Sequence, residues 1–333
     1  MSKKAAAILF PEVNRAVLDE VPVPEPGEQE VLVQIHYSSI SPGTERWCLT
    51  GRLQTPEGPT PAFPHVPGYQ AAGVVVEAGR AVKSLKPGDR VFSRNCRAPA
   101  GWKGSWWGGH VALHVAEEAD VIRLPAGVGL PEASGLLLAQ VGYNGASRPP
   151  VAAGSAAAVI GDGLVGQYAA QVLRHRGAHV LLSGLAPLRL ELARRHSADE
   201  VFDATGGDFG SFVGGRFPKG VQVAVETASS SRTIRQAVDL LAYGGHLVLN
   251  GFYPPSESLL DWHWLRTKEL TAYFPNSRNR ERLQSTLRLI GQGAVKVKEL
   301  VTHTVPPSAA AGLFEKLLGS DADFLGLLIQ WRN

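Results

Sequence analysis

AAAVIGDGLVGQYAAQVLRHRGAHVLLSG, residues 156–184, is the stretch that decides the fold of this chain. Its apolar opening, 156–160, predicts a buried parallel strand, and a helical pattern follows the glycines. Gly161, Gly163 and Gly166 keep the spacing G-x-G-x-x-G. The first glycine permits a tight turn, the second lets the backbone approach a pyrophosphate, and the third lets the helix pack closely on the strand. Alone this spacing often marks only a turn, but in a strand, turn, helix and strand frame it predicts a dinucleotide site at the positive end of the helix.

The end of this stretch bears on the choice of cofactor. An NAD site usually places an acid about 20 residues beyond the glycine motif, where it binds the adenosine ribose hydroxyls. Gly184 stands at that position, so the acid is missing. Its loss removes repulsion against a 2′-phosphate, and Ser183 and Arg189 are close enough in sequence to contact one, which favours NADP. Arg189 is equally typical of a solvated helix residue. Leu164 and Val165, at the start of the helix, are expected to line the same cofactor.

Strands and helices alternate after residue 150, which is the order of a parallel α/β sheet. Strands are predicted at 156–160, 178–183, 200–203, 221–227, 245–252 and 269–274, and helices at 165–176, 187–196 and 231–242. Ligands of such sheets bind beyond the carboxyl ends of the strands. Thr227, after the fourth strand, and Gly251, Phe252 and Tyr253, after the fifth, are therefore expected to border the nicotinamide. Both segments could instead be ordinary strand ends.

The chain before this sheet is rich in short strands separated by Gly and Pro turns such as SPGTE and LKPGD. After the sheet, two helices and two strands follow without a Gly/Ser linker. We therefore expect this tail to complete the first domain. The predicted domains are 1–143 completed by 277–333, and a nucleotide-binding domain at 144–276.

The composition is that of an ordinary globular protein. Of 333 residues 44% are hydrophobic and 19% are charged, and the net charge of +3 forms no basic block, so neither nucleic acid nor an anionic membrane is expected as a partner. No apolar run is long enough to cross a bilayer, and the N-terminal apolar stretch is too short for a signal peptide, which favours a cytoplasmic location. Cys48 and Cys96 lack the spacing of zinc ligands and are expected to be reduced, structural thiols.

Segments along nearly the whole chain resemble the medium-chain dehydrogenase/reductase superfamily, in the order found in alcohol dehydrogenases. They are SISPGTE at 39–45, PGYQAAGVV at 67–75, KPGDRV at 86–91, GGH at 108–110 and the glycine motif. The resemblance implies an α/β protein with a GroES-like β-rich catalytic domain and a Rossmann doubly wound parallel sheet. It also implies an NAD(P)-dependent oxidoreductase that interconverts a secondary alcohol and a ketone.

Other segments are similar to the zinc-less branch of 3-hydroxyethyl bacteriochlorophyllide a dehydrogenases. They are GTER at 43–46, PGY at 67–69, GFY at 251–253, TH at 302–303 and the closing WR at 331–332. This likeness implies oxidation of a 1-hydroxyethyl group on a chlorin ring and favours NAD. The chain departs from the branch at Gly184, where the branch keeps an acid, and in its Trp-rich insert at 102–107.

The positions of the family's zinc ligands differ in this chain. Zinc-dependent members carry Cys-Gly-Thr-Asp where this chain has PGTE at 42–45, and Gly-His-Glu where it has GYQ at 68–70. Pro42 and Tyr69 thus replace two ligands, and Gln70 replaces the neighbouring acid. Because catalytic zinc needs three protein ligands, the resemblance implies an enzyme without a catalytic metal.

Without a metal, a hydrogen-bond donor must stabilise the alkoxide and relay its proton. Thr44 matches the relay hydroxyl of the family motif, and Tyr69 offers a phenol where the ligand histidine would be. His65 and Glu45 are near in sequence and could pass the proton onward. Each has a structural alternative: Tyr69 fills the space of the metal, Thr44 caps a turn, His65 is a loop histidine, and Glu45 pairs with Arg46 or another cation.

A substrate cleft is expected between the domains, with Tyr143 and Asn144 entering from the junction and Trp47 and Trp106 from the first domain. An aromatic rim suits a flat or bulky small molecule, such as a tetrapyrrole, a sugar ring or a polyketide. Two other functions stay open: a zinc-less enone or quinone reductase, and a nucleotide-binding module without catalysis. Pairing of two nucleotide domains edge to edge would give a homodimer.

Overall fold

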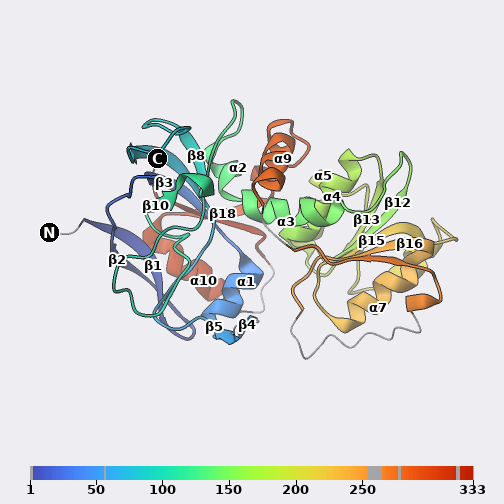
Figure 1. The fold of residues 1–333 in the computed structure, drawn as a ribbon. Helices are drawn as coiled ribbons and strands as arrows, with labels where there is room; N and C mark the ends of the chain where they lie inside the picture. The colour runs from blue at the N-terminus through green and yellow to red at the C-terminus, as the bar shows by residue number, and fades with distance from the viewer. Residues whose placement is uncertain (1–2, 56–57, 254–264, 277–278, 320–322, 333) are drawn as a thin grey trace. The chain divides into compact units, whose positions relative to one another are not determined.

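The computed structural model describes residues 3–55, 58–253, 265–276, 279–319 and 323–332 (Figure 1). The chain divides into two compact units: unit 1 is Met1–Leu136 with Val301–Asn333, and unit 2 is Leu137–Leu300. The chain passes between them after residues 136 and 300, compared with residues 143 and 276 expected from the sequence. In the part of the chain that is described, none of the helices combines the length and the apolar composition that crossing a bilayer requires.

Unit 2 is built on a six-stranded parallel sheet. In spatial order its strands are β14 (Glu200–Asp203), β13 (His179–Gly184), β12 (Ala156–Ile160), β15 (Val221–Glu226), β16 (Leu241–Leu249) and β17 (Thr271–Tyr273). All five residues of β12 are buried, as its small and β-branched side chains predict. The strand order reverses between β12 and β15, so the carboxyl ends of these two strands border the crevice where such folds bind ligands. The predicted Rossmann sheet is confirmed.

Helices cover both faces of this sheet. They are α4 (Leu164–His175) and α5 (Pro187–His196) on one face, and α7 (Ser231–Leu240), with α6 (Phe209–Gly214) packed beside it, on the other (Figure 1). Unit 2 also contains α3 (Leu136–Ala146), α9 (Arg280–Gly291) and the short helix η3 (Lys298–Leu300). The sequence analysis did not predict α6. It begins at Phe209, and the carboxylate of the preceding Asp208 caps it by accepting from the N–H of Ser211 at 2.7 Å.

Unit 1 contains two larger sheets and a hairpin. One sheet holds β11 (Val121–Arg123), β8 (Arg90–Ser93), β7 (Ala71–Ala78), β3 (Glu30–Ile40), β19 (Gly326–Gln330) and β18 (Val301–Val305), with β10 (Leu113–Glu117) also paired to β3. The other holds β2 (Arg15–Pro22), β1 (Lys4–Glu12), β6 (His65–Val66) and β9 (Ser105–Trp106), and the hairpin is β4 (Leu53–Thr55) with β5 (Gly58–Thr60). Its helices are α1 (Pro42–Leu49), α2 (Leu130–Ser134) and α10 (Ala310–Leu318), with short turns η1 (Glu118–Asp120) and η4 (Pro307–Ala309).

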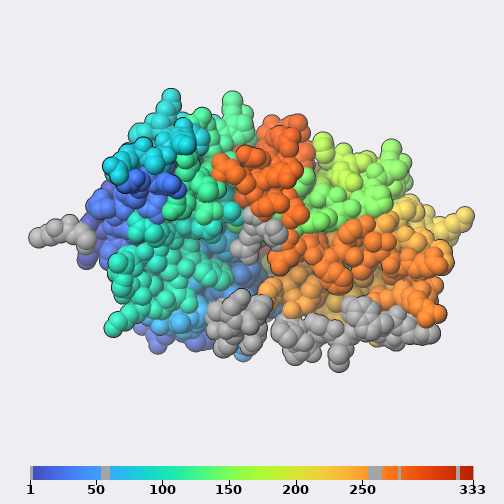
Figure 2. Space-filling model, in the orientation of Figure 1, coloured from blue at the N-terminus to red at the C-terminus, as the bar shows by residue number. Residues whose placement is uncertain are grey.

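The C-terminal segment is part of the sheet begun near the N-terminus. Strand β19 runs antiparallel to β3, with Leu327 opposite Ile40. Helix α10 adds Phe314 to the same core, where its ring meets that of Phe10 edge-on at 5.0 Å. Figure 2 shows one outer face of the molecule as atoms, in the orientation of Figure 1.

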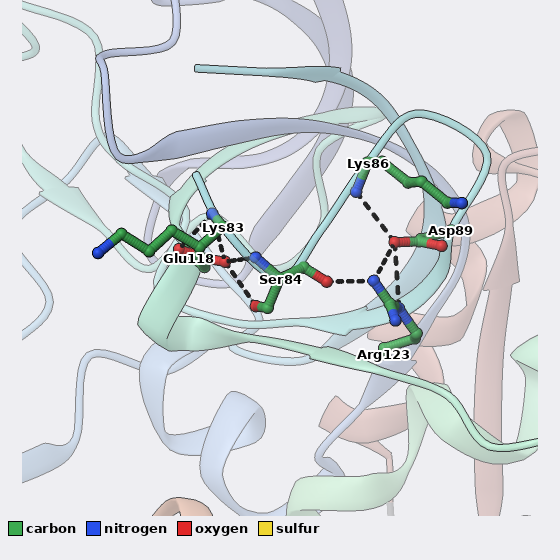
Figure 3. A network of polar contacts seen from close by, with 6 residues as sticks. All are labelled: Lys83, Ser84, Lys86, Asp89, Glu118 and Arg123. Carbon is green, nitrogen blue, oxygen red and sulfur yellow. Dashed lines mark hydrogen bonds and ion pairs between the residues drawn. The ribbon is translucent and has the colours of Figure 1, made fainter. Parts of the chain in front are cut away.

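A surface network holds the turn between β7 and β8 (Figure 3). Asp89 accepts from the N–H of Lys86 at 2.9 Å and from Nη2 of Arg123 at 2.8 Å. Arg123 also donates to the carbonyl oxygen of Ser84, whose N–H donates to Glu118 at 2.5 Å. The network therefore ties the KPGD turn to η1 and β11.

Candidate functional site

The glycine motif forms the turn from β12 into α4. Gly161 has a φ of +116°, which residues with side chains rarely adopt. A Cβ on Gly166 would lie 2.1 Å from the carbonyl oxygen of Gly161, so the helix reaches the strand only because residue 166 is glycine. A Cβ on Gly163 would meet nothing within 4 Å, and among the described residues no side chain caps α4. Because the first N–H groups of a helix lack partners within it, Gly163, Leu164 and Val165 present a site that fits a pyrophosphate.

Thr227 follows β15 and supports this turn. Its hydroxyl donates to the carbonyl oxygen of Ile160 at 3.0 Å. A Cβ on Gly161 would lie 2.3 Å from that same hydroxyl oxygen. The structure therefore brings Thr227 beside the glycine motif, at the point where the strand order reverses.

Glu226, the last residue of β15, connects the ends of two neighbouring strands. Its buried carboxylate accepts from the N–H groups of Ala228 at 2.7 Å and Ser229 at 2.9 Å, and also from the hydroxyl of Tyr253. Burial raises the pKa of both Glu226 and Tyr253. Phe252 donates its N–H to the hydroxyl of Ser229 at 3.0 Å. The turn after β16 is thus fastened to the end of β15.

Asp162 occupies the place where the missing acid would be. A Cβ on Gly184 would lie 2.4 Å from both Cβ and Oδ2 of Asp162. Oδ2 accepts from the N–H groups of Leu185 at 2.8 Å and Ala186 at 2.9 Å, while Oδ1 lies 3.7 Å from Nη1 of Arg189. A carboxylate therefore stands at the end of β13 although residue 184 is glycine. The sequence analysis missed it, and its signal is the Asp inside the glycine motif.

The residues around Gly184 differ in accessibility. Ser183, expected to contact a phosphate, is buried inside the sheet. Leu185 is 65% exposed and Leu188 is 38% exposed, although both are apolar. Apolar side chains beside a convergent polar group are typical of a ligand-binding edge. These two leucines were not singled out from the sequence.

In unit 1, Glu45 lies inside the protein and is bound on both oxygens. Oε1 accepts from the N–H of Ser41 at 2.7 Å, and Oε2 lies 2.8 Å from Nε2 of His110. Nδ1 of His110 lies 2.8 Å from the hydroxyl of Ser38, which also accepts from Nε1 of Trp331 at 2.8 Å. The partner of Glu45 in the structure is His110, which lies 65 residues along the chain.

The other residues of the expected relay lie nearby in sequence but differ in burial. Thr44 lies on α1, and both it and Tyr69 are half-buried. His65 is fully buried, and burial lowers its pKa to about 4. The ring of Trp107 meets that of His65 at 5.2 Å and that of Tyr69 at 6.0 Å. Trp107 was noted in the sequence only as part of the Trp-rich insert.

The four expected substrate residues lie in separate units, Trp47 and Trp106 in unit 1 and Tyr143 and Asn144 in unit 2. Trp106 donates its indole N–H to the carbonyl oxygen of Cys96 at 2.8 Å, and Trp47 packs half-buried on the core of unit 1. Asn144 is buried and donates to the carbonyl oxygen of residue 276 at 3.2 Å. Tyr143, its neighbour on α3, is half-buried.

The donors present do not fit a catalytic zinc ion. Pro42 has no ligating atom, and Gln70 donates to the carbonyl oxygen of Ser39 at 3.4 Å inside the sheet. Within the described ranges no group of three or more His, Cys, Asp or Glu side chains is placed to hold a metal. Both cysteines are buried and free, and burial raises the pKa of Cys96 to about 12, which disfavours a thiolate ligand.

Comparison with known families agrees with this architecture. The model of the alcohol dehydrogenase GroES-like domain matches residues 27–126, and that of the zinc-binding dehydrogenases matches residues 165–292. An alcohol dehydrogenase of Rhizobium meliloti is 30% identical, over 84% of this chain and 86% of its own. The chain belongs to the medium-chain dehydrogenase/reductase superfamily and is an oxidoreductase.

Two further relatives cover almost the whole chain. The 2-desacetyl-2-hydroxyethyl bacteriochlorophyllide A dehydrogenase of Cereibacter sphaeroides is 29% identical over 99% of both chains. A structure from Sinorhizobium meliloti 1021, described as a zinc-binding dehydrogenase bound to NADP, has a TM-score of 0.84 at 22% identity, covering 98% of this chain and 99% of its own. The resemblance read from the sequence is confirmed at the level of the superfamily and the fold.

Proposed function

We propose that this protein is a zinc-independent dehydrogenase that interconverts a secondary alcohol and its ketone with a nicotinamide cofactor. The observation that carries the proposal is the donor set at the family's zinc positions. Pro42 and Tyr69 replace ligands there, Gln70 replaces the neighbouring acid, and Glu45 is bound to His110. A protein with this set must stabilise the substrate oxygen with its own hydrogen-bond donors.

The proposed mechanism uses two hydroxyl groups of unit 1. A nicotinamide bound at the glycine motif would supply the hydride acceptor for alcohol oxidation and the hydride donor for ketone reduction. The phenol of Tyr69 donates a hydrogen bond to the substrate oxygen. The hydroxyl of Thr44 relays the proton: it accepts the proton of the substrate alcohol while it passes its own to solvent water, and the reverse transfer accompanies ketone reduction. Glu45 acts as a positioning residue, because its bond to the N–H of Ser41 at 2.7 Å fixes the first turn of α1, which carries Thr44. His65 is neutral at pH 7, because burial lowers its pKa to about 4, and it packs in the interior of unit 1.

A hydroxyethyl group on a chlorin ring is the proposed substrate. The similarity to the bacteriochlorophyllide dehydrogenase, which spans 99% of both chains, supports this choice. A half-buried aromatic pair, Tyr69 and Trp107, lies beside the proposed donor and suits a flat ring system. An enone reductase is the second candidate. In that reaction hydride is delivered to the carbon–carbon double bond, so no hydrogen-bond donor is needed to stabilise an alkoxide.

Turnover of Tyr69→Phe tests the mechanism. Alcohols and ketones, including a hydroxyethyl chlorin, are assayed by nicotinamide absorbance with NAD and NADP in parallel. We expect the variant to lose about 100-fold in kcat, with unchanged affinity for the nucleotide. Tyr37→Phe, a half-buried tyrosine of β3 in the same unit, is the matched control and keeps wild-type turnover.

Three results would overturn the proposal. Near-normal alcohol turnover by Tyr69→Phe would remove the phenol from the mechanism. Stoichiometric zinc in the purified protein would contradict the metal-free site. Turnover of enones alone, unchanged by Tyr69→Phe, would favour the reductase.

A further inference from the structure

We infer that Asp162 binds the adenosine ribose hydroxyls and selects NAD over NADP, in the role that an acid at position 184 has in other dinucleotide sites. This inference rests on the proposed nicotinamide-linked function. It reverses the preference for NADP that the glycine at position 184 suggests from the sequence.

Asp162 and Gly184 lie against each other at the carboxyl edge of the sheet. The N–H of Gly161 donates to the carbonyl oxygen of Ser183 at 2.9 Å, so the glycine turn is fastened to the end of β13. The next residue, Asp162, therefore lies over Gly184, and a Cβ on Gly184 would lie 2.4 Å from its Oδ2. The two positions share one volume, so a side chain at one requires glycine at the other. Asp162 and Gly184 form a reciprocal pair, and the carboxylate stands at the carboxyl edge of the sheet.

The groups that a 2′-phosphate would need lie beside Asp162. The N–H groups of Leu185 and Ala186, at the start of α5, would suit a phosphate. Both already donate to Oδ2 of Asp162, at 2.8 and 2.9 Å. Arg189, the cation that could pair with a phosphate, lies 3.7 Å from Oδ1 of the same carboxylate. A 2′-phosphate would therefore meet a negative charge, and the N–H groups of Leu185 and Ala186 are already engaged by that charge.

The remaining carboxylate oxygen of Asp162 is Oδ1. Oδ1 lies 3.7 Å from Nη1 of Arg189, which is longer than a hydrogen bond, and Asp162 keeps 8% of its surface exposed. A ribose hydroxyl can donate to Oδ1, whereas a phosphate dianion has no proton to give. The arrangement thus favours the ribose of NAD on both counts.

Equilibrium binding of NADH and NADPH to the full-length protein tests the inference without any substrate. We expect wild-type protein to bind NADH at least about 10-fold more tightly than NADPH, because a hydrogen bond to a charged group is lost with NADPH. Asp162→Asn keeps an oxygen for the two N–H groups and replaces the charge. It is expected to weaken NADH by about 10-fold and to strengthen NADPH.

Two further variants separate recognition from folding. In the double variant Asp162→Gly with Gly184→Asp, the acid moves to the end of β13 and the facing position becomes glycine, so the preference for NADH is expected to return. Asp199→Asn is the matched control. Like Asp162, Asp199 accepts from a backbone N–H, that of Val180 at 2.8 Å, and pairs with an arginine, Arg174 at 2.9 Å, but it lies at the amino end of β13. This control should leave the ratio of the two affinities unchanged.

The outcomes are distinguishable. Tighter or equal binding of NADPH by wild-type protein would overturn the inference and leave the proposed function standing. An unchanged affinity ratio in folded Asp162→Asn would make Asp162 a structural cap only. If the single variants unfold, failure of the folded double variant to prefer NADH overturns the inference. Binding of neither nucleotide would overturn the proposed function itself.

Discussion

Units 1 and 2 bury their acids in different places. In unit 1, Glu45 is 0% exposed, and both of its oxygens are bound by groups of the chain itself, Ser41 and His110. In unit 2, Asp162 follows β12 at the carboxyl edge of the sheet, beside the point where the strand order reverses, and it keeps 8% of its surface exposed. The difference separates two uses of a buried carboxylate: one enclosed by the chain stabilises the fold, while one at the crevice can also meet a ligand.

Histidines of unit 1 extend this contrast. His65 and His114 are both fully buried, and burial lowers their pKa to about 4 and about 3. Both imidazoles are neutral at pH 7, so neither supplies a positive charge for catalysis. Their lowered pKa values instead make the free energy of unfolding depend on pH.

The largest expected effect is that of Glu45→Ala on stability. Removing the carboxylate leaves His110 and the N–H of Ser41 without their acceptor inside the protein, which should lower the free energy of unfolding by about 3 kcal/mol. The affinity for nucleotides should not change, because the glycine motif lies in unit 2. Denaturant unfolding followed by circular dichroism measures the first quantity, and a binding titration measures the second.

Glu45→Gln is the control for this experiment. Its amide oxygen can still accept from Ser41, and its size is unchanged, so it should lose less than the alanine variant. A loss below about 1 kcal/mol for Glu45→Ala would show that this acid does not hold unit 1 together.

Local patterns in the sequence account for much of unit 2. The strand predicted at 156–160 and the helix predicted at 187–196 have those bounds as β12 and α5. A run of apolar residues and a Pro at the first turn of α5 are local signals, so no tertiary knowledge is needed. Helix α6 was not predicted from the sequence because its six residues are too few to show a helical period. In unit 1, β2 was not predicted because its side chains are mostly exposed and do not alternate regularly between buried and exposed.

The candidate sites depend on contacts that no local pattern contains. Glu45 and His110 are 65 residues apart, and the sequence offered Arg46 as a nearer cation. Gly184 could be recognised as a missing acid, but the filling of its place by Asp162 depends on how β12 and β13 lie side by side. The sequence therefore identifies the positions that matter, while the partner of each follows from the fold.

The next effect in size is expected from His65→Phe at acid pH. The folded pKa of about 4 lies below the ordinary 6.5, so the unfolded chain takes up a proton first as the pH falls. The stability from this residue is complete above pH 6.5 and is lost as the pH falls toward 4, by about 3 kcal/mol. Phenylalanine fits the same aromatic neighbours, Phe10 at 5.8 Å and Trp107 at 5.2 Å, and cannot titrate.

Unfolding measured at pH 7, 5.5 and 4 tests this prediction. The variant should match the wild type at pH 7 and lose less stability on acidification. An equal loss in both proteins would mean that the acid sensitivity lies in other groups.

The smallest effect is expected from Arg123→Ala in the surface network of unit 1 (Figure 3). The side chain of Arg123 is 53% exposed, so its ion pair with Asp89 is screened by water and salt. The free energy of unfolding should fall by less than about 1 kcal/mol, and by still less at high salt. Lys83→Ala is the control, because Lys83 enters the network through its backbone N–H, which alanine keeps. Chemical unfolding at low and high salt gives both numbers. A loss as large as that of Glu45→Ala would mean that the exposed ion pair stabilises unit 1 as much as the buried Glu45–His110 pair does. The contrast between the two units would then no longer depend on burial.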